Sequence, residues 1–253
     1  MATSTQTQTQ AANPVFFKLP ETDADSEAIF SGHDQEQIRL MEEMCIVIDN
    51  NDKPIGSMSK KSCHLMTNIN KGLLHRAFSV LLFNDKNELL LQQRASEKIT
   101  FANQWTNTCC SHPLNIAGET GSTLPEAIQG AKRAAQRKLQ HELGISKEQA
   151  PLDKLNFVTR MTYQAASDDI WGEYETTYIF IMKANVELDI NRNEVQDTQY
   201  VTVDKLRELL QEPGVEFTPW FRIFCCKPML FEWWKSLDGD LTPHLNEQQI
   251  RRM

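Results

Sequence analysis

The sequence predicts an α+β fold in which a mixed β-sheet is sandwiched by helices. Strand-like segments lie before and after one long amphipathic helix, and regular alternation of strand and helix is absent. This order favours an α+β architecture over a doubly wound parallel sheet. Hydrophobic residues make up 40% of the 253 residues, which is enough to form one substantial core.

The first half of the chain predicts three strands. Residues 45–49 form a short apolar run that ends at the turn-forming residues 50–54. Residues 77–83 and 88–94 are two strand-like runs on either side of a polar turn at 84–87. This arrangement predicts a β-hairpin.

The long helix is predicted between Pro125 and Leu143. Its alanine and leucine residues recur at helical spacing, as the core-facing stripe of an amphipathic helix does. Pro125 suits the first turn, and Gly144 follows as a C-terminal stop.

The C-terminal third predicts two more strands and two more helices. The β-rich runs 156–163 and 176–183 complete the mixed sheet. Residues 203–211 predict a short helix, and residues 220–237 a longer one that Pro228 kinks.

Composition excludes several classes of protein. The net charge of -8 argues against a protein that gathers nucleic acid or anionic membrane through bulk positive charge. Any anionic ligand therefore needs a local basic pocket. The six cysteines include no CxxC pair, which indicates a reduced intracellular protein. No run approaches the roughly 18 apolar residues of a membrane span, so we expect a soluble, cytoplasmic protein without membrane insertion.

Both ends of the chain lie outside the predicted core. Residues 1–34 begin rich in Thr, Gln and Ala and end acidic, so we expect a disordered tail and folded structure from about residue 35. The last residues, Arg251-Arg252-Met253, partly match a peroxisomal address, although such an address begins with a small residue. They could equally be a solvated basic end.

Three histidines and two glutamates suggest a metal site. His64, His75 and His112 lie near predicted turns or strand edges, and Glu173 and Glu175 form an E-x-E pair at the start of a strand. Side chains at i and i+2 share one face of a strand, so both carboxylates can reach one ion. This donor set suits Zn, Mn or Fe and tolerates Mg. Each histidine alone is more commonly a surface or core-edge residue, so both interpretations stay open.

A second candidate group surrounds a pair of cysteines. Cys110 lies two residues before His112 among small polar residues, as a nucleophile or proton carrier does. Cys109 and Cys110 could equally be small buried hydrophobic residues.

Basic and aromatic residues could line the same pocket. Lys60, Arg94 and Lys98 lie near strand ends or loops and could converge on a phosphate, although an exposed position is common for each. Tyr163 and Trp220 are more often core residues, but a tryptophan face also stabilises a cation.

Five separated motifs, taken in order, resemble the type I isopentenyl-diphosphate isomerases. They are Ser59-Lys60-Lys61-Ser62-Cys63-His64, Gly72-Leu73-Leu74-His75-Arg76-Ala77-Phe78-Ser79, Trp105 through Pro113, Trp171-Gly172-Glu173-Tyr174-Glu175 and Thr218-Pro219-Trp220-Phe221. The resemblance spans residues 40–253 and implies a Nudix fold with extra C-terminal helices. Residues 35–253 would then form a single Nudix-type catalytic domain, as a monomer or a weak homo-oligomer.

The resemblance also implies a reaction and assigns roles. Members convert isopentenyl diphosphate to dimethylallyl diphosphate in isoprenoid and sterol-precursor biosynthesis, by adding one proton and removing another. The catalytic pair would be Cys110 and Glu175. The first metal shell, holding Mg2+, Mn2+ or Zn2+, would be His64, His75, His112, Glu173 and Glu175. A second, diphosphate-bound Mg2+ would contact Glu142, and no flavin is expected. Substrate-binding residues would be Lys60, Arg94, Lys98, Ser111, Tyr163 and Trp220.

Two other functions stay open. In the Nudix signature helix, residues 137–144 keep only Glu142 of the three usual glutamates, and Lys138 and His141 stand at the other two positions. Nudix hydrolases use those carboxylates to hold Mg2+, so the replacements weaken a hydrolase interpretation. A catalytically inactive Nudix binding module is the second alternative. Flavin-dependent isomerases are (β/α)8 barrels, which this order of elements does not suggest.

Overall fold

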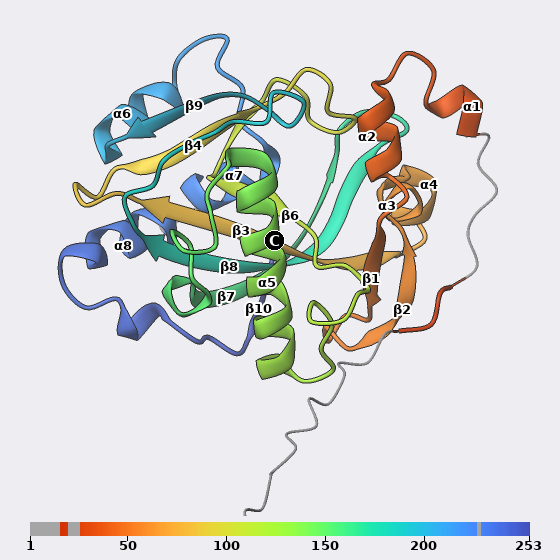
Figure 1. The fold of residues 1–253 in the computed structure, drawn as a ribbon, viewed down its shortest axis with the longest axis horizontal. Coiled ribbons are helices and arrows are strands. Elements are labelled where there is room, and N and C mark those ends of the chain that lie inside the picture. Colours follow the sequence, from red (N-terminus) through yellow and green to blue (C-terminus); the bar gives the residue numbers. More distant parts are fainter. Residues whose placement is uncertain (1–15, 20–25, 227–228) are drawn as a thin grey trace, which may run out of the picture.

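The computed structural model describes residues 16–19, 26–226 and 229–253 (Figure 1). Its centre is a mixed sheet whose main path runs β10-β7-β8-β3-β1-β2, with β4, β5, β6 and β9 joined to it. The described strands are β1 (Met44–Ile48), β2 (Pro54–Ser59), β3 (Leu74–Phe83), β4 (Leu89–Arg94), β5 (Trp105–Thr106), β6 (Cys109–Ser111), β7 (Asn156–Ala166), β8 (Gly172–Lys183), β9 (Val195–Val201) and β10 (Ile250–Arg252). The described helices are α1 (Ser26–Ile29), α2 (Gln35–Leu40), α3 (Lys60–His64), α4 (Met66–Ile69), α5 (Leu124–Leu143), α6 (Val203–Leu209), α7 (Pro219–Cys226) and α8 (Met229–Lys235). Short 3-10 turns are η1 (Leu152–Lys154), η2 (Ser236–Asp238) and η3 (Thr242–His244).

The sheet has a hydrophobic core on each face. Along β3, Phe78, Val80 and Leu82 pack with the alanine stripe of α5, which crosses in front of the sheet in Figure 1. Leu81 and Phe83 point to the opposite face, where they join residues of α7 and α8. Each buried side chain of this size contributes about 1.5–3 kcal/mol. The predicted α+β architecture, a mixed sheet between helices with extra C-terminal helices, is confirmed.

Helix α5 begins and ends as its sequence predicts. Thr123 and Glu126 form a capping box at its start. Gly144 ends it in the left-handed region with φ of 70°, and a Cβ atom at this position would lie 2.6 Å from the backbone oxygen of Asp189. Glycine is therefore required by both conformation and space.

The predicted hairpin between β3 and β4 forms only at its tip. The two strands pair at Phe83 and Leu89 and then separate. The Thr108 hydroxyl lies between them, donating to the Leu90 carbonyl at 2.6 Å and accepting from the Leu82 amide at 2.9 Å. Strand β4 pairs instead with β9, which the sequence analysis did not predict.

Ordered structure starts earlier than the predicted residue 35. The Phe16 amide donates to the Asn115 side chain at 2.7 Å, and the Leu19 amide donates to the Ser57 carbonyl at 2.7 Å. Helix α1 also precedes residue 35. The Thr/Gln/Ala-rich residues 1–13 lie outside the described residues, so the predicted tail there stays a prediction.

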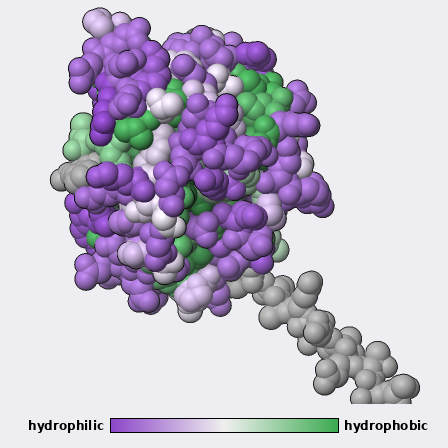
Figure 2. All heavy atoms as spheres, turned by 90° about the vertical axis from the view of Figure 1, so that its left-hand side faces the viewer, coloured by the Kyte–Doolittle hydropathy of each residue, from purple (hydrophilic) through white to green (hydrophobic). Residues whose placement is uncertain are grey.

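The C-terminal region differs from its prediction in one respect. Two helices, α7 and α8, stand where one long helix was predicted, and Pro228 lies outside the described residues. The chain then returns to the sheet, because β10 pairs in parallel with β7. Hydrophilic side chains dominate the face shown in Figure 2. Within the described chain, every helix falls short of the length and apolar character that a bilayer crossing requires.

Candidate metal and substrate site

Sheet register brings three predicted site residues into one row. His75 on β3 lies directly opposite Glu175 on the parallel strand β8. Tyr163 on β7 lies opposite Glu175 from the other side. Glu173, two residues earlier on β8, shares the face of Glu175. The edge of the central strands therefore presents an imidazole, two carboxylates and a phenol together.

Two further histidines complete a buried cluster. His64 ends α3 and His112 follows β6, and the three imidazole centroids lie 4.8–4.9 Å apart. One Glu173 oxygen lies 3.0, 3.8 and 3.9 Å from the Nε2 atoms of His64, His75 and His112. Glu175 lies 3.3 Å from His112 and 3.8 Å from His75. The four residues His64, His75, His112 and Glu173 could hold a divalent ion.

The hydrogen bonding of this cluster leaves several buried atoms that could bind a cation. The Nδ1 atom of His64 lies 2.7 Å from the Lys60 carbonyl, a contact that orients the ring with Nε2 towards the cluster. Nε2 of His64 faces a Glu173 oxygen at 3.0 Å. His64 Nε2, both ring nitrogens of His75 and Glu173 Oε2 are buried without a hydrogen-bond partner among the described residues. A metal ion would satisfy the Glu173 oxygen, His64 Nε2 and one ring nitrogen of His75.

The charge states of the cluster suit a metal site. Burial, and then the neighbouring His64, lower the pKa of His75 to about 3, and burial likewise holds the pKa of His112 well below its usual value. Both rings are therefore neutral, the form that binds metals. Burial raises the pKa of Glu173, but the adjacent His64 and the charge of Arg94 favour its carboxylate form, and the net pKa lies below its usual value. Burial and the charge of Glu173 raise the pKa of Glu175 well above its usual range.

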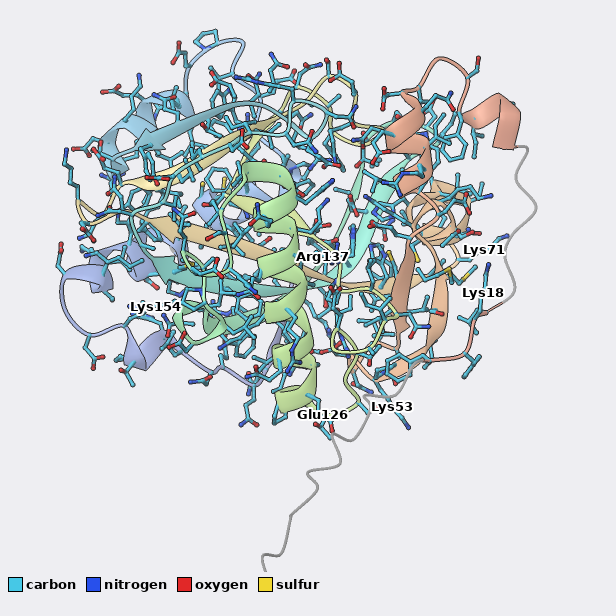
Figure 3. The ribbon with its side chains drawn as sticks, in the orientation of Figure 1. Lys18, Lys53, Lys71, Glu126, Arg137 and Lys154 are labelled. Carbon is cyan, nitrogen blue, oxygen red and sulfur yellow. The ribbon has the colours of Figure 1, made fainter. Side chains whose placement is uncertain are left out.

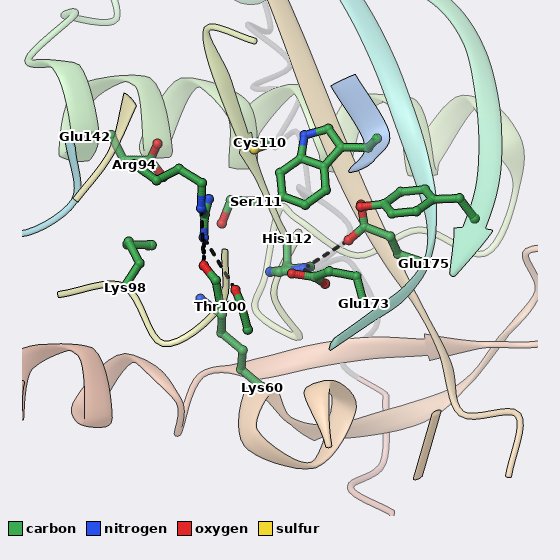
Figure 4. Close-up of a pocket in the computed structure, with 12 residues that line it drawn as sticks. Lys60, Arg94, Lys98, Thr100, Cys110, Ser111, His112, Glu142, Glu173 and Glu175 are labelled. Carbon is green, nitrogen blue, oxygen red and sulfur yellow. Dashed lines mark hydrogen bonds and ion pairs between the residues drawn. The ribbon is translucent and has the colours of Figure 1, made fainter. Parts of the chain in front are cut away.

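One pocket joins this cluster to the predicted substrate residues. Figure 4 shows Lys60, Arg94 and Lys98 on one side of the pocket, and Glu173 and Glu175 on the other. The pocket is therefore polarised, with cations at one end and the carboxylates of the metal cluster at the other. The complete lining is Lys60, Arg94, Lys98, Thr100, Cys110, Ser111, His112, Glu142, Tyr163, Glu173, Glu175 and Trp220.

Two proton-carrying groups face this pocket. Tyr163 donates to Glu175 at 2.7 Å, and both side chains are buried. Burial raises the pKa of the Cys110 thiol to about 12, while the Arg94 guanidinium and a hydrogen bond with Thr106 act in the opposite direction. The carboxyl and the thiol therefore both favour their protonated forms in this pocket.

Several contacts hold Arg94 in place at the cationic end of the pocket. Arg94 donates to the Thr100 carbonyl at 2.9 Å and to the Phe101 carbonyl at 3.0 Å. Its guanidinium carbon lies 5.8 Å from the ring centroid of Trp220, within the range of a cation–π contact. The Trp220 indole in turn donates to Asn107 at 3.2 Å. The Trp220 ring, which the sequence analysis expected to stabilise a cation, is thus held by Arg94 and by Asn107.

The signature helix α5 contributes from behind the pocket. Arg137 reaches from α5 toward the preceding loop (Figure 3), where it forms two hydrogen bonds to Glu119, at 2.6 and 2.9 Å. It also donates to the backbone carbonyl of His112 at 3.2 Å. Glu142 lines the pocket, but Lys138 lies 3.2 Å from one of its oxygens and Gln92 donates to the other at 3.2 Å.

All thirteen predicted site residues meet at this location. Eleven line the pocket, and the other two, His64 and His75, lie in the adjoining cluster. Sequence reasoning missed Thr100, Asn107 and Glu194. Thr100 follows Lys98 closely, which was a usable signal. Asn107 and Glu194 carry no local signal, because their partners Trp220 and Lys98 come from distant segments.

Comparison with known proteins defines the class first. A family model of the NUDIX domain matches residues 73–221, which is more than half of the chain. The fold is accordingly the Nudix fold, with α5 as its signature helix.

Comparison with curated proteins then defines the family. An isopentenyl-diphosphate delta-isomerase of Gibberella zeae is 63% identical over all of both chains. One of Aspergillus fumigatus is 55% identical over 98% of this chain and 92% of its own. One of Bos taurus is 48% identical over 87% of this chain and 96% of its own. The chain belongs to the isopentenyl-diphosphate delta-isomerase family.

Proposed function

We propose that this protein interconverts isopentenyl diphosphate and dimethylallyl diphosphate, a step of isoprenoid and sterol-precursor biosynthesis. The observation that carries the proposal is the polarised pocket, because cations stand at one end and the carboxylates Glu173 and Glu175 at the other, with Cys110 between them. A diphosphate fits the cationic end, where Lys60, Arg94, Lys98 and Ser111 lie. Its short hydrocarbon chain then extends toward Cys110 and Glu175.

The reaction needs two proton transfers. A proton added to the terminal alkene carbon produces a tertiary cation, and a proton lost from the carbon next to the oxygen-bearing one restores the alkene. We assign the addition to Glu175, which Tyr163 orients, and the removal to Cys110. Both groups favour their protonated forms here, so one of them must lose a proton before turnover in either direction. The face of Trp220 stabilises the cation, and the buried pocket excludes water.

The cluster of three histidines and Glu173 is proposed to hold one divalent ion, Mg2+, Mn2+ or Zn2+, with Glu175 completing the shell. When bound, this ion would supply positive charge that increases the acidity of Glu175. A second, diphosphate-associated Mg2+ is proposed near Glu142. Its carboxylate already contacts Lys138 and Gln92, so this ion would have to displace one of those contacts.

An assay on two products separates this function from diphosphate hydrolysis. The purified protein is incubated with isopentenyl diphosphate and Mg2+, and the sample is followed by proton NMR and by phosphate release. Dimethylallyl signals without phosphate support isomerisation. Phosphate without the new alkene would replace the proposal with a hydrolase, and unchanged substrate under metal-loaded conditions would favour a binding module.

A further inference from the structure

A buried carboxylate outside the pocket contacts one of its cations. Glu194 lies in the loop before β9, and its side chain is 1% exposed. Its Oε2 atom accepts a hydrogen bond from the Lys98 ammonium at 2.5 Å, and its Oε1 atom accepts one from the Gln37 amide at 3.2 Å. Lys98 lines the pocket whereas Glu194 does not. Glu194 therefore contacts the pocket lining directly through Lys98.

A second buried pair extends this contact across the back of the pocket. The Lys138 ammonium lies 3.7 Å from Glu194 Oε2 and 3.2 Å from Glu142 Oε1. Lys98, Glu194, Lys138 and Glu142 form a chain of alternating charges, all largely buried. Its two ends, Lys98 and Glu142, line the pocket. Glu194 and Lys138, in the middle of the chain, each contact two groups of opposite charge. These contacts fix the positions of Lys98 and Glu142 relative to each other.

We propose that Glu194 is a positioning residue for the diphosphate, acting by holding the Lys98 ammonium, charged and oriented, at the cationic end of the pocket. This inference rests on the proposed function for its ligand class, a diphosphate.

The environment of Lys98 shows why such a partner is needed. Burial and the charges of Lys60, Arg94 and Lys138 together lower the pKa of Lys98 to about 8, even though the Glu194 carboxylate raises it. Without that carboxylate the side chain would lose its proton more easily and would be free to adopt other rotamers. Either change weakens its attraction for a diphosphate.

The N-terminal helix α2 takes part in the same arrangement. Gln37 donates not only to Glu194 but also to the Asn193 side chain at 2.8 Å. Asn193 in turn donates to Asp34, the N-cap of α2, at 2.9 Å. These contacts fix the loop that carries Glu194, so the segment ahead of β1 supports the substrate end of the site.

The test is a double-mutant cycle on binding of inorganic diphosphate, measured by calorimetry with Mg2+ present. Glu194→Gln keeps the shape of the side chain and removes its charge, and we expect affinity to fall about tenfold or more, as for loss of a charge-assisted hydrogen bond. In a Lys98→Gln background the same change should have no further effect. Glu194→Asp, which keeps the charge, should recover part of the affinity.

Asp52→Asn is the matched control. Asp52 is a buried carboxylate paired with Arg76 at 2.8 Å, and neither residue lines the pocket. The Asp52→Asn variant should have a lower melting temperature and an unchanged affinity for diphosphate. The inference would be overturned if folded Glu194→Gln bound diphosphate as tightly as the wild type. It would also be overturned if Glu194→Gln lowered the affinity by the same factor in the Lys98→Gln background. If the cycle shows the expected coupling between Glu194 and Lys98 but the protein does not isomerise isopentenyl diphosphate, the inference is supported and only the proposed function is refuted.

Discussion

Tyr163→Phe removes one oxygen atom from the pocket and keeps the shape of the side chain. The lost contact is the 2.7 Å hydrogen bond to Glu175, in which both partners are more than nine-tenths buried. Glu175 becomes negatively charged as it gives up its proton, and hydrogen bonds to charged groups contribute about 1.5–3 kcal/mol. Since about 1.4 kcal/mol corresponds to a tenfold change in rate, kcat/KM should fall roughly 10- to 150-fold. The pKa of Glu175 should also rise further, because this hydrogen bond lowers it.

The chain offers a matched control for this change. Tyr178 is also buried, and its hydroxyl also donates to a carboxylate, that of Asp52, away from the pocket. Steady-state kinetics with isopentenyl diphosphate and thermal unfolding should therefore separate the two variants. Tyr178→Phe should lower stability and keep activity. Equal kinetic losses in both variants, or an unchanged kcat/KM in Tyr163→Phe, would refute the assigned role of Tyr163.

Three further predictions concern other walls of the pocket. Cys110→Ala should nearly abolish isomerisation, whereas Cys109→Ala should lower the activity only slightly, because Cys109 contacts Glu142 of α5 and does not line the pocket. Comparable losses of activity in the two variants would mean that the catalytic role was assigned to the wrong cysteine. Because burial lowers the pKa of Lys98 to about 8, its charge is present below that pH and lost above it. The free-enzyme profile of kcat/KM should accordingly fall as pH rises through about 8, and a flat profile to pH 9.5 would contradict this. Trp220→Leu should reduce kcat more than it raises KM, because the ring is proposed to stabilise only the cation; a change confined to KM would argue against that role.

Buried elements of the fold were predictable from the sequence because their patterns are local. The later parts of strands β3 and β8, residues 77–83 and 178–182, are largely apolar runs, and α5 has a regular alanine stripe with clear end signals. Strand β9 escaped prediction because most of its residues are polar and partly exposed, as on a sheet with one solvated side. Strands β5 and β6 contain two and three residues, too few to show any period. The register of β3 on β8 is likewise invisible in either strand alone.

Prediction of the site depended on motifs rather than on spacing. The E-x-E pair placed Glu173 and Glu175 on one face from strand geometry alone. The meeting of His64, His75 and His112 follows from three separate elements, so only the family resemblance brought them together. Residues that act behind the pocket had no such guide: contacts such as Glu194 with Lys98 depend on how a loop before β9 approaches the end of β4.

The most direct test of the account is a metal titration of the purified protein. Metal is removed with a chelator, and Mn2+ or Zn2+ is added back stepwise in the presence of excess Mg2+, while bound ion and isomerisation are measured on the same samples. Activity should rise in proportion to bound ion and reach its plateau at one ion per chain, and Glu173→Gln should lose both ion binding and activity. Full activity without an ion at the histidine cluster would contradict this expectation.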